Sequence, residues 1–212
     1  MKRIIIFAIS ILFVLPISAA KKGVDVLLIE KYNALGGAAV NALVMPFMSF
    51  WTTDPETEEK KYISGDLFLE IVDEMSKLAG KEKSDERPVN FDEEFLKLVL
   101  NRMAVKYGVN LLFNTTVTEA LVTDGKITSI KAFGKSKQLE LFADHFIDAT
   151  GDGDLAKYLK MPIYRRDIVQ PPTPCCIMHG AIAEQEVQRL IKEHGEEFGL
   201  PDDFGWCSDL PG

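Results

Sequence analysis

The organisation of this chain is decided first by residues 23–37, which read GVDVLLIEKYNALGG. Residues 24–29 form a short and nearly continuous apolar run, a pattern typical of a strand that is buried on both faces of a sheet. The run ends in a carboxylate, Glu30, and a loop with the pair Gly36-Gly37 follows. Such strands occur in parallel sheets covered by helices, so we expect an α/β protein.

The segment before this strand has two interpretations. Two basic residues precede an apolar run over residues 4–17, and small residues follow at 18–20. These features are typical of a secretory signal peptide, which we favour and which predicts an exported or periplasmic protein. The run is short for a stable membrane span, which needs about 20 apolar residues. The alternative, in a cytoplasmic protein, is a buried strand at 4–8 and a helix that ends before Gly23.

Two amphipathic helices are expected after the strand. Residues 66–79 place apolar side chains at three- and four-residue steps, and Gly80 ends the run. Residues 92–107 do the same, with acids at the start and Gly108 just beyond the end, as the helix dipole and a left-handed cap favour. The charged stretch 52–61, which contains a proline, is expected to be an exposed loop.

The next part of the chain predicts strands. Short apolar runs lie at 109–113, 116–122, 127–133, 139–142 and 145–149. Asp124-Gly125, between the second and third runs, is a strong hairpin signal, so these strands predict an antiparallel meander inserted before the last strand of the main sheet.

The last of these strands runs into the acidic turn TGDGD at residues 150–154. A helix that begins at Asp154 is expected to leave free backbone N–H groups near this turn. The turn partly follows a calcium-binding loop, but position twelve would be Leu159 where a glutamate is needed, so we expect no metal.

Composition excludes several classes of protein. The chain has 212 residues and a net charge of −8, which argues against nucleic acid as a partner. Three cysteines are too few for a disulfide framework. After Met161 the signals weaken, and a proline-rich stretch at 171–174 indicates a crossing between domains.

Taken in order, residues 26–39, 92–117 and 146–155 resemble FAD-dependent oxidoreductases of the two-dinucleotide-binding-domain type. The similar branch includes the flavin subunit of heterodisulfide reductases and fumarate-reductase-like flavoproteins. The resemblance implies a Rossmann-like FAD-binding domain with an antiparallel β-meander insertion, incomplete at both ends. It further implies an FAD-binding-like domain at 21–160 after a separate segment 1–20, and the start of a substrate domain at 161–212. Some relatives carry a [4Fe–4S] cluster, but this sequence has no C-x-x-C spacing to support one.

The resemblance also implies a cofactor site. Glu30 would accept hydrogen bonds from the ribose hydroxyls of the adenosine half, where its alternative is a surface acid at a strand end. Gly36-Gly37 would let the backbone approach the cofactor, where the alternative is a tight turn. Val117 would offer its backbone to the adenine, where the alternative is a sheet residue that contacts no ligand. The full set of implied cofactor-binding residues is Glu30, Lys31, Gly36, Gly37, Val117, Thr150, Gly151, Asp152, Gly153 and Asp154.

The sequence departs from the family at the phosphate-binding turn. The G-x-G-x-x-G glycines that cradle the pyrophosphate would lie near Phe7, Ile9 and Leu12, but no glycine precedes Gly23. Two hypotheses therefore stand. The chain is a segment of an FAD-dependent oxidoreductase that acts on an unidentified small molecule, or it is a non-catalytic derivative that binds no flavin.

No residue can be assigned to catalysis from the sequence. His179 could donate a proton, but a lone histidine on a strand is more often structural. Arg165 and Arg166 could bind a carboxylate substrate, but they fit a solvated pair better. We interpret Cys175-Cys176 as packing residues, because neighbouring cysteines form only a strained ring.

Overall fold

The computed structural model describes residues 3–8, 14–45, 47, 50–80, 91–162, 164 and 184–198. The chain divides into two compact units, residues 1–175 and residues 176–212. The described part of the second unit consists of helix α6 (Glu184–His194) and the 3-10 helix η1 (Gly195–Phe198). Within the described ranges, every helix is too short or too polar to cross a membrane.

The first unit holds all the strands of the described chain and five helices. Its strands are β1 (Arg3–Ala8), β2 (Asp25–Ile29), β3 (Trp51–Thr53), β4 (Lys60–Tyr62), β5 (Asn110–Leu112), β6 (Thr115–Thr123), β7 (Lys126–Gly134), β8 (Lys137–Leu141) and β9 (His145–Ala149). Its helices are α1 (Val14–Lys21), α2 (Ala38–Asn41), α3 (Leu67–Leu78), α4 (Glu93–Tyr107) and α5 (Asp154–Tyr158).

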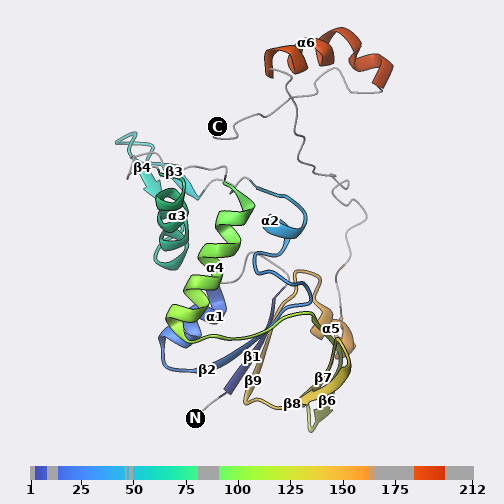
Figure 1. Ribbon diagram of the computed structural model, residues 1–212. Helices are drawn as coiled ribbons and strands as arrows, with labels where there is room; N and C mark the ends of the chain where they lie inside the picture. Colours follow the sequence, from blue (N-terminus) through green and yellow to red (C-terminus); the bar gives the residue numbers. More distant parts are fainter. Residues whose placement is uncertain are drawn as a thin grey trace. The chain divides into compact units, whose positions relative to one another are not determined.

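A parallel sheet in the order β5-β2-β1-β9 forms the centre of this unit (Figure 1). β1 pairs with β2 from Arg3↔Asp25 to Phe7↔Ile29, and with β9 from Ile4↔His145 to Ala8↔Ala149. The structure therefore has the strand and helix that were the alternative to a signal peptide, because β1 fills the slot between β2 and β9 and α1 follows it. Export of the chain and the domain bounds at 20 and 160 stay predictions.

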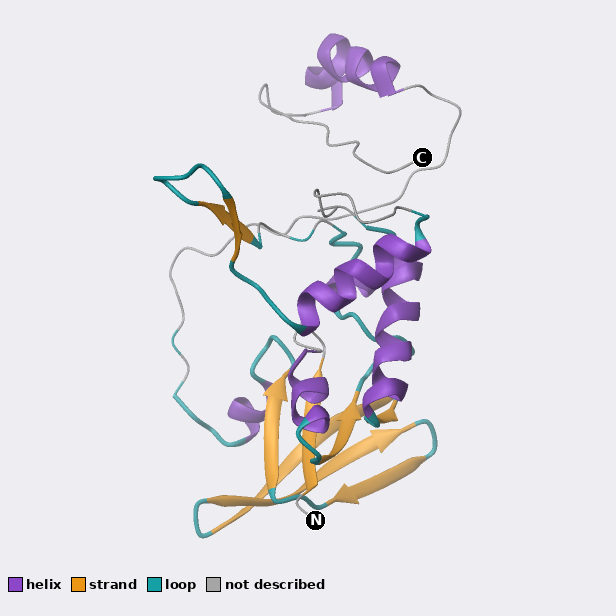
Figure 2. Cartoon of the chain, turned by 90° about the vertical axis from the view of Figure 1, so that its left-hand side faces the viewer, coloured by secondary structure: helices purple, strands orange, loops and turns teal. Residues whose placement is uncertain are grey.

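The two faces of the sheet are covered by different layers (Figures 1 and 2). Val26 and Leu28 of β2 pack into the larger apolar core with helices α1, α3 and α4. Leu27 and Ile29 pack instead into a smaller core with Ile130 of the meander and with α5. Because successive side chains of a strand point to opposite faces, this alternation gives three layers, of helices, parallel sheet and meander. The α/β expectation, with parallel and antiparallel sheets, is confirmed.

Both long helices form where the sequence predicts them. The side chain of Asp92 accepts hydrogen bonds from the backbone N–H groups of Glu94 and Phe95, at 2.7 and 3.1 Å, and so caps α4. Gly108 ends the same helix with a φ of 71°, in the left-handed region that glycine favours.

The meander is also close to its prediction. Asp124 and Gly125 have φ angles of 50° and 74° and join β6 to β7 through a two-residue turn with both φ angles positive, which matches the right-handed twist of the strands. Residues 52–61 differ in part from the expected loop. β3 and β4 pair antiparallel there, from Trp51↔Tyr62 to Thr53↔Lys60, and only the residues between them form a turn.

Candidate functional site

The predicted site residues gather at the carboxyl edge of the parallel sheet. Phe7 of β1 pairs with Ile29 on one side and with Asp148 on the other, so Glu30 and Ala149 extend to the same level on either side of β1. Two spacings between neighbouring strands, each about 4.8 Å, separate those backbones by about 10 Å. The structure therefore brings Glu30 and the turn at 150–154 to one edge, as the sequence predicts. In open α/β sheets this edge is where ligands bind.

Glu30 is a buried carboxylate at this edge, with a relative exposure of 2%. Its Oε1 accepts a hydrogen bond from the backbone N–H of Tyr32 at 2.9 Å. Burial raises the pKa of the Glu30 carboxyl above its ordinary value, although the Tyr32 N–H and the Lys31 charge act in the opposite direction. The surface-acid interpretation of Glu30 is therefore wrong. Lys31 itself lies over the ring of Tyr32, 4.9 Å from its centroid.

Backbone hydrogen bonds join Glu30 to the start of the meander. The Glu30 N–H donates to the carbonyl of Leu112 at 2.9 Å, and the Glu30 carbonyl accepts from the N–H of Thr115 at 3.1 Å. β6 therefore leaves the sheet edge directly beside Glu30. Val117, two residues after Thr115 in β6, is half-buried. Its carbonyl accepts a hydrogen bond from the Tyr158 hydroxyl at 2.9 Å.

Asp148 and Thr150 close the acidic turn after β9. Oδ1 of Asp148 accepts from the N–H and the hydroxyl of Thr150, at 2.9 and 2.7 Å, and Oδ2 accepts from the N–H of Leu155 at 2.8 Å. Oγ1 of Thr150 accepts from the N–H groups of Gly153 and Asp154, at 3.1 and 3.2 Å. The expectation of free N–H groups at the start of α5 is wrong, because these two side chains already take them.

Asp148 is absent from the set of cofactor-binding residues that the resemblance implies. Burial acts to raise the pKa of its carboxyl, but the hydrogen bonds from Thr150, Leu155 and Ala156 outweigh burial and the pKa is lowered. Gly151 and Gly153 have φ angles of 80° and 69°, which let the chain turn back tightly enough for these bonds. Asp152 is exposed at the tip of the turn. The spacing of an aspartate and a threonine two residues later, before a helix start, is the signal that could have identified this cap.

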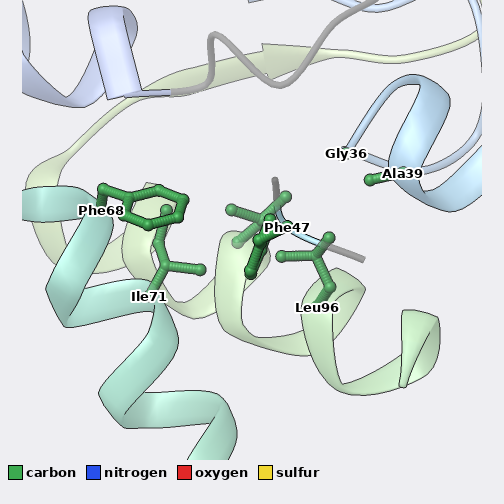
Figure 3. A pocket seen from close by; sticks show the side chains of 7 residues that line it. Gly36, Ala39, Phe47, Phe68, Ile71 and Leu96 are labelled. Carbon is green, nitrogen blue, oxygen red and sulfur yellow. The ribbon is translucent and has the colours of Figure 1, made fainter. Parts of the chain in front are cut away.

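Gly36 and Gly37 lie on the helical side of the site. Gly36 has a φ of 115°, and a Cβ added there would overlap Cγ2 of Val40 and lie 3.5 Å from Cδ1 of Leu100. Figure 3 shows the small apolar pocket that Gly36 lines together with side chains of α2, α3, α4 and Phe47. The structure gives Gly36 a role in a tight turn and in close packing, and a contact between the glycine pair and a cofactor stays a prediction.

The residues that the sequence analysis considered for chemistry, and to none of which it assigns a catalytic role, lie outside the described residues. These are Arg165, Arg166, Cys175, Cys176 and His179. Within the described part of the chain, no group of three histidine, cysteine or acidic side chains could hold a metal ion.

A family model described as FAD dependent oxidoreductase matches residues 16–203. The chain belongs to this family. No curated protein matches the chain.

Solved structures support the fold of this family member. Thermovibrio ammonificans THI4 is 16% identical with a TM-score of 0.50, over 75% of this chain and 61% of THI4. BexE, from a study of oxidation in BE-7585A biosynthesis, is 14% identical with a TM-score of 0.51, over 75% of this chain and 33% of BexE. AlpK is 13% identical with a TM-score of 0.50, over 74% and 33% of the two chains. The chain thus spans about six-tenths of THI4 and a third of the other two.

The side chains at the sheet edge fit one half of FAD better than the other. Glu30 offers a carboxylate acceptor for the ribose hydroxyls of the adenosine half. The pyrophosphate needs backbone N–H donors, but those of α5 are taken by Asp148 and Thr150. α1 contributes fewer donors than a usual helix start, because Pro16 in its first turn has no N–H. Phe7 lies within β1, and Ile9 and Leu12 lie outside the described residues. Among the described residues, this edge offers an acceptor for the adenosine half, and the N–H groups of Asp154 and Leu155 in α5 already have partners.

Proposed function

We propose that this chain forms the FAD-binding part of an FAD-dependent oxidoreductase and holds FAD through its adenosine half. The observation that carries the proposal is Glu30, a buried acceptor at the carboxyl end of β2 that faces the same edge as the turn after β9. In this proposal Glu30 binds the ribose hydroxyls, the backbone at Val117 binds the adenine, and Lys31, Gly36, Gly37 and residues 150–154 line the rest of the site. A bound flavin would supply the redox chemistry on a small-molecule substrate.

The affinity for FAD should depend on the Glu30 carboxylate. We expect Glu30→Gln to weaken binding of FAD and of adenosine by about 10- to 100-fold, because a hydrogen bond to a charged group contributes about 1.5–3 kcal/mol. Asp124→Asn is the matched control, since it makes the same change of carboxylate to amide in the exposed turn between β6 and β7. Calorimetric titration of the full chain with each ligand measures both effects.

The same variant separates a ligand role of Glu30 from a structural one. The pKa of Glu30 is raised by burial, so its contribution to stability is present below the ordinary value of 4.5 and is lost as the pH rises through the folded value. Glu30→Gln should therefore not lower the melting temperature at neutral pH. A variant that melts much earlier than the wild type and binds adenosine equally well would show that Glu30 serves the fold alone.

A second candidate function is a derivative that binds no flavin. It is favoured by the poor supply of N–H donors for a pyrophosphate at α1 and α5. The purified full chain decides between the two candidates. Visible flavin absorbance that persists after gel filtration with FAD supports the enzyme, and a colourless protein that binds neither FAD nor adenosine supports the derivative.

We also propose that residues 1–20 stay with the mature chain. They supply β1, an inner strand that pairs with both β2 and β9, and most of α1, in which Ile17 is fully buried against the helical core. Amino-terminal sequencing of the protein from its native cells tests this. A mature chain that begins near residue 21 would support export through a signal peptide instead.

A further inference from the structure

A single side-chain hydrogen bond connects α5 to an irregular point of the meander. The Tyr158 hydroxyl donates to the Val117 carbonyl at 2.9 Å, across 41 residues of sequence. Val117 stands immediately before a register shift in the pairing of β6 with β7, because Val117 pairs with Ala132 whereas Glu119 pairs with Lys131. Thr118 is therefore the extra residue of a β-bulge, a feature that turns the backbone locally away from the regular ladder.

Both ends of α5 are fixed to other elements. The amide groups of its first turn donate to Asp148 and Thr150 at the end of β9. Tyr158, its last residue, reaches the bulge of β6. α5 and the meander lie next to each other in Figure 1. The short helix thus spans the distance between the turn after β9 and the backbone at Val117.

The Tyr158 hydroxyl stays a donor over the range of ordinary assays. Burial, and to a lesser extent the charge of Asp154, raises the pKa of Tyr158 above its ordinary value. The phenol therefore keeps its proton at neutral and mildly alkaline pH and can donate to a carbonyl throughout.

We propose that Tyr158 is a positioning residue, which holds the Val117 carbonyl in the orientation that recognises an adenine base. The inference rests on the proposed function, in which the backbone at Val117 binds the adenine. A carbonyl oxygen has two lone pairs, so the bond from Tyr158 leaves capacity for a second donor. Adenine has an exocyclic amino group that can fill this place, whereas hypoxanthine carries an oxygen there and would face the carbonyl with an acceptor.

Adenosine and inosine are therefore the probes, because they differ only at the 6-position, amino against oxo, and at the N1 proton that accompanies the oxo group, and because neither carries a phosphate. The wild-type chain should bind adenosine more tightly than inosine. Tyr158→Phe removes only the hydroxyl, and it should weaken adenosine binding by about 5-fold while it leaves inosine binding unchanged, since one neutral hydrogen bond changes an affinity by about 2- to 10-fold. A purely structural role of Tyr158 would weaken both ligands equally.

Tyr107→Phe is the matched control. The Tyr107 hydroxyl donates to the carboxylate of Glu70, at 2.8 and 3.1 Å, between α4 and α3 on the helical face of the sheet. This variant also loses one tyrosine hydroxyl that bridges two elements, and it should leave the ratio of adenosine to inosine affinity at the wild-type value.

Amide hydrogen exchange gives a readout without ligand. Tyr158→Phe should speed exchange at residues 117–119 and 154–158 more than in the α3–α4 pair. Unchanged exchange at residues 117–119 and 154–158 in Tyr158→Phe overturns the role of Tyr158 and leaves the proposed function standing. The same holds if the wild type prefers adenosine and the ratio of adenosine to inosine affinity does not fall in Tyr158→Phe. A wild type that binds both nucleosides equally overturns recognition by the Val117 carbonyl. A wild type that binds neither nucleoside nor FAD overturns the proposed function and, with it, the adenine role of Tyr158.

Discussion

Replacement of Asp148 by asparagine tests whether the hydrogen bonds of this one carboxylate stabilise the acidic turn after β9. The side chain accepts hydrogen bonds at 2.7–2.9 Å from two donors of Thr150 and from the Leu155 N–H, and a further one from the Ala156 N–H. Asparagine keeps one acceptor oxygen and places an amide N–H₂ against the other donors, so at least one N–H loses its partner. An unsatisfied donor costs about 1–3 kcal/mol, and because Asp148 is only partly buried we expect Asp148→Asn to cost about 2 kcal/mol of unfolding free energy.

The loss of unfolding free energy in Asp148→Asn should depend on pH in a defined direction. The pKa of Asp148 is lowered in the folded chain, so its contribution to stability is fully present above the ordinary value of 3.8 and is lost as the pH falls through the folded value. The difference between wild type and Asp148→Asn should therefore be constant near neutral pH and become smaller below about pH 4.

Thermal denaturation at several pH values measures both effects. For a chain of this size, about 2 kcal/mol corresponds to a fall of about 4–8 °C in Tm. Asp152→Asn is the control, because Asp152 lies in the same turn and is exposed. It should shift Tm by less than about 1–2 °C, as surface substitutions usually do. An Asp148→Asn chain as stable as Asp152→Asn at neutral pH would refute the reasoning.

Three further predictions concern the rest of the fold. Gly36→Ala should lower the free energy of unfolding, measured by urea denaturation, by about 3 kcal/mol, because the added Cβ meets Val40 and a φ of 115° is strained for alanine. A loss below about 1 kcal/mol would contradict the packing at this turn. Asp92→Ala should lower the free energy of unfolding in the same assay by about 1 kcal/mol, since the helix cap of α4 is lost. Asp92→Asn keeps an acceptor oxygen at this position and should retain most of the wild-type stability. Deletion of residues 1–20 should give a chain without cooperative thermal unfolding, because β1 is an inner strand that joins β2 to β9. A soluble, cooperatively folded product would show that the sheet closes without β1.

The sequence predicts those elements whose signals are local. The apolar run of β2 and the hairpin at Asp124-Gly125 each identify themselves within a few residues. The acid at the end of β2 and the turn after β9 could be placed at one edge because the carboxyl ends of parallel strands meet there. The start of the chain could not be settled in the same way. The apolar run at 4–17 favours a signal peptide by its sequence, and the alternative strand becomes visible only through its pairing with β2 and β9.

The contacts that form the site could not be predicted, because they join residues that are far apart in the sequence. Tyr158 and Val117 are 41 positions apart, and nothing in either neighbourhood marks a hydroxyl that reaches a bulge. The cap on α5 was missed for a different reason. The acidic turn has several aspartates of similar appearance, and the structure shows that Asp148 accepts a hydrogen bond from the Leu155 N–H at the start of α5 whereas Asp152 is exposed.

The two carboxylates at the sheet edge, Asp148 and Glu30, differ in the hydrogen-bond donors that contact them. Asp148 has its hydrogen bonds supplied by its own turn, and its pKa is lowered. Glu30 is buried more deeply and accepts a hydrogen bond from Tyr32, but burial raises its pKa, so folding disfavours its charged form. A ligand hydroxyl that donates to Glu30 would therefore gain more than one that donates to Asp148, whose oxygens are already engaged. This difference supports the proposal that the adenosine ribose binds on the β2 side of the edge, where Glu30 lies.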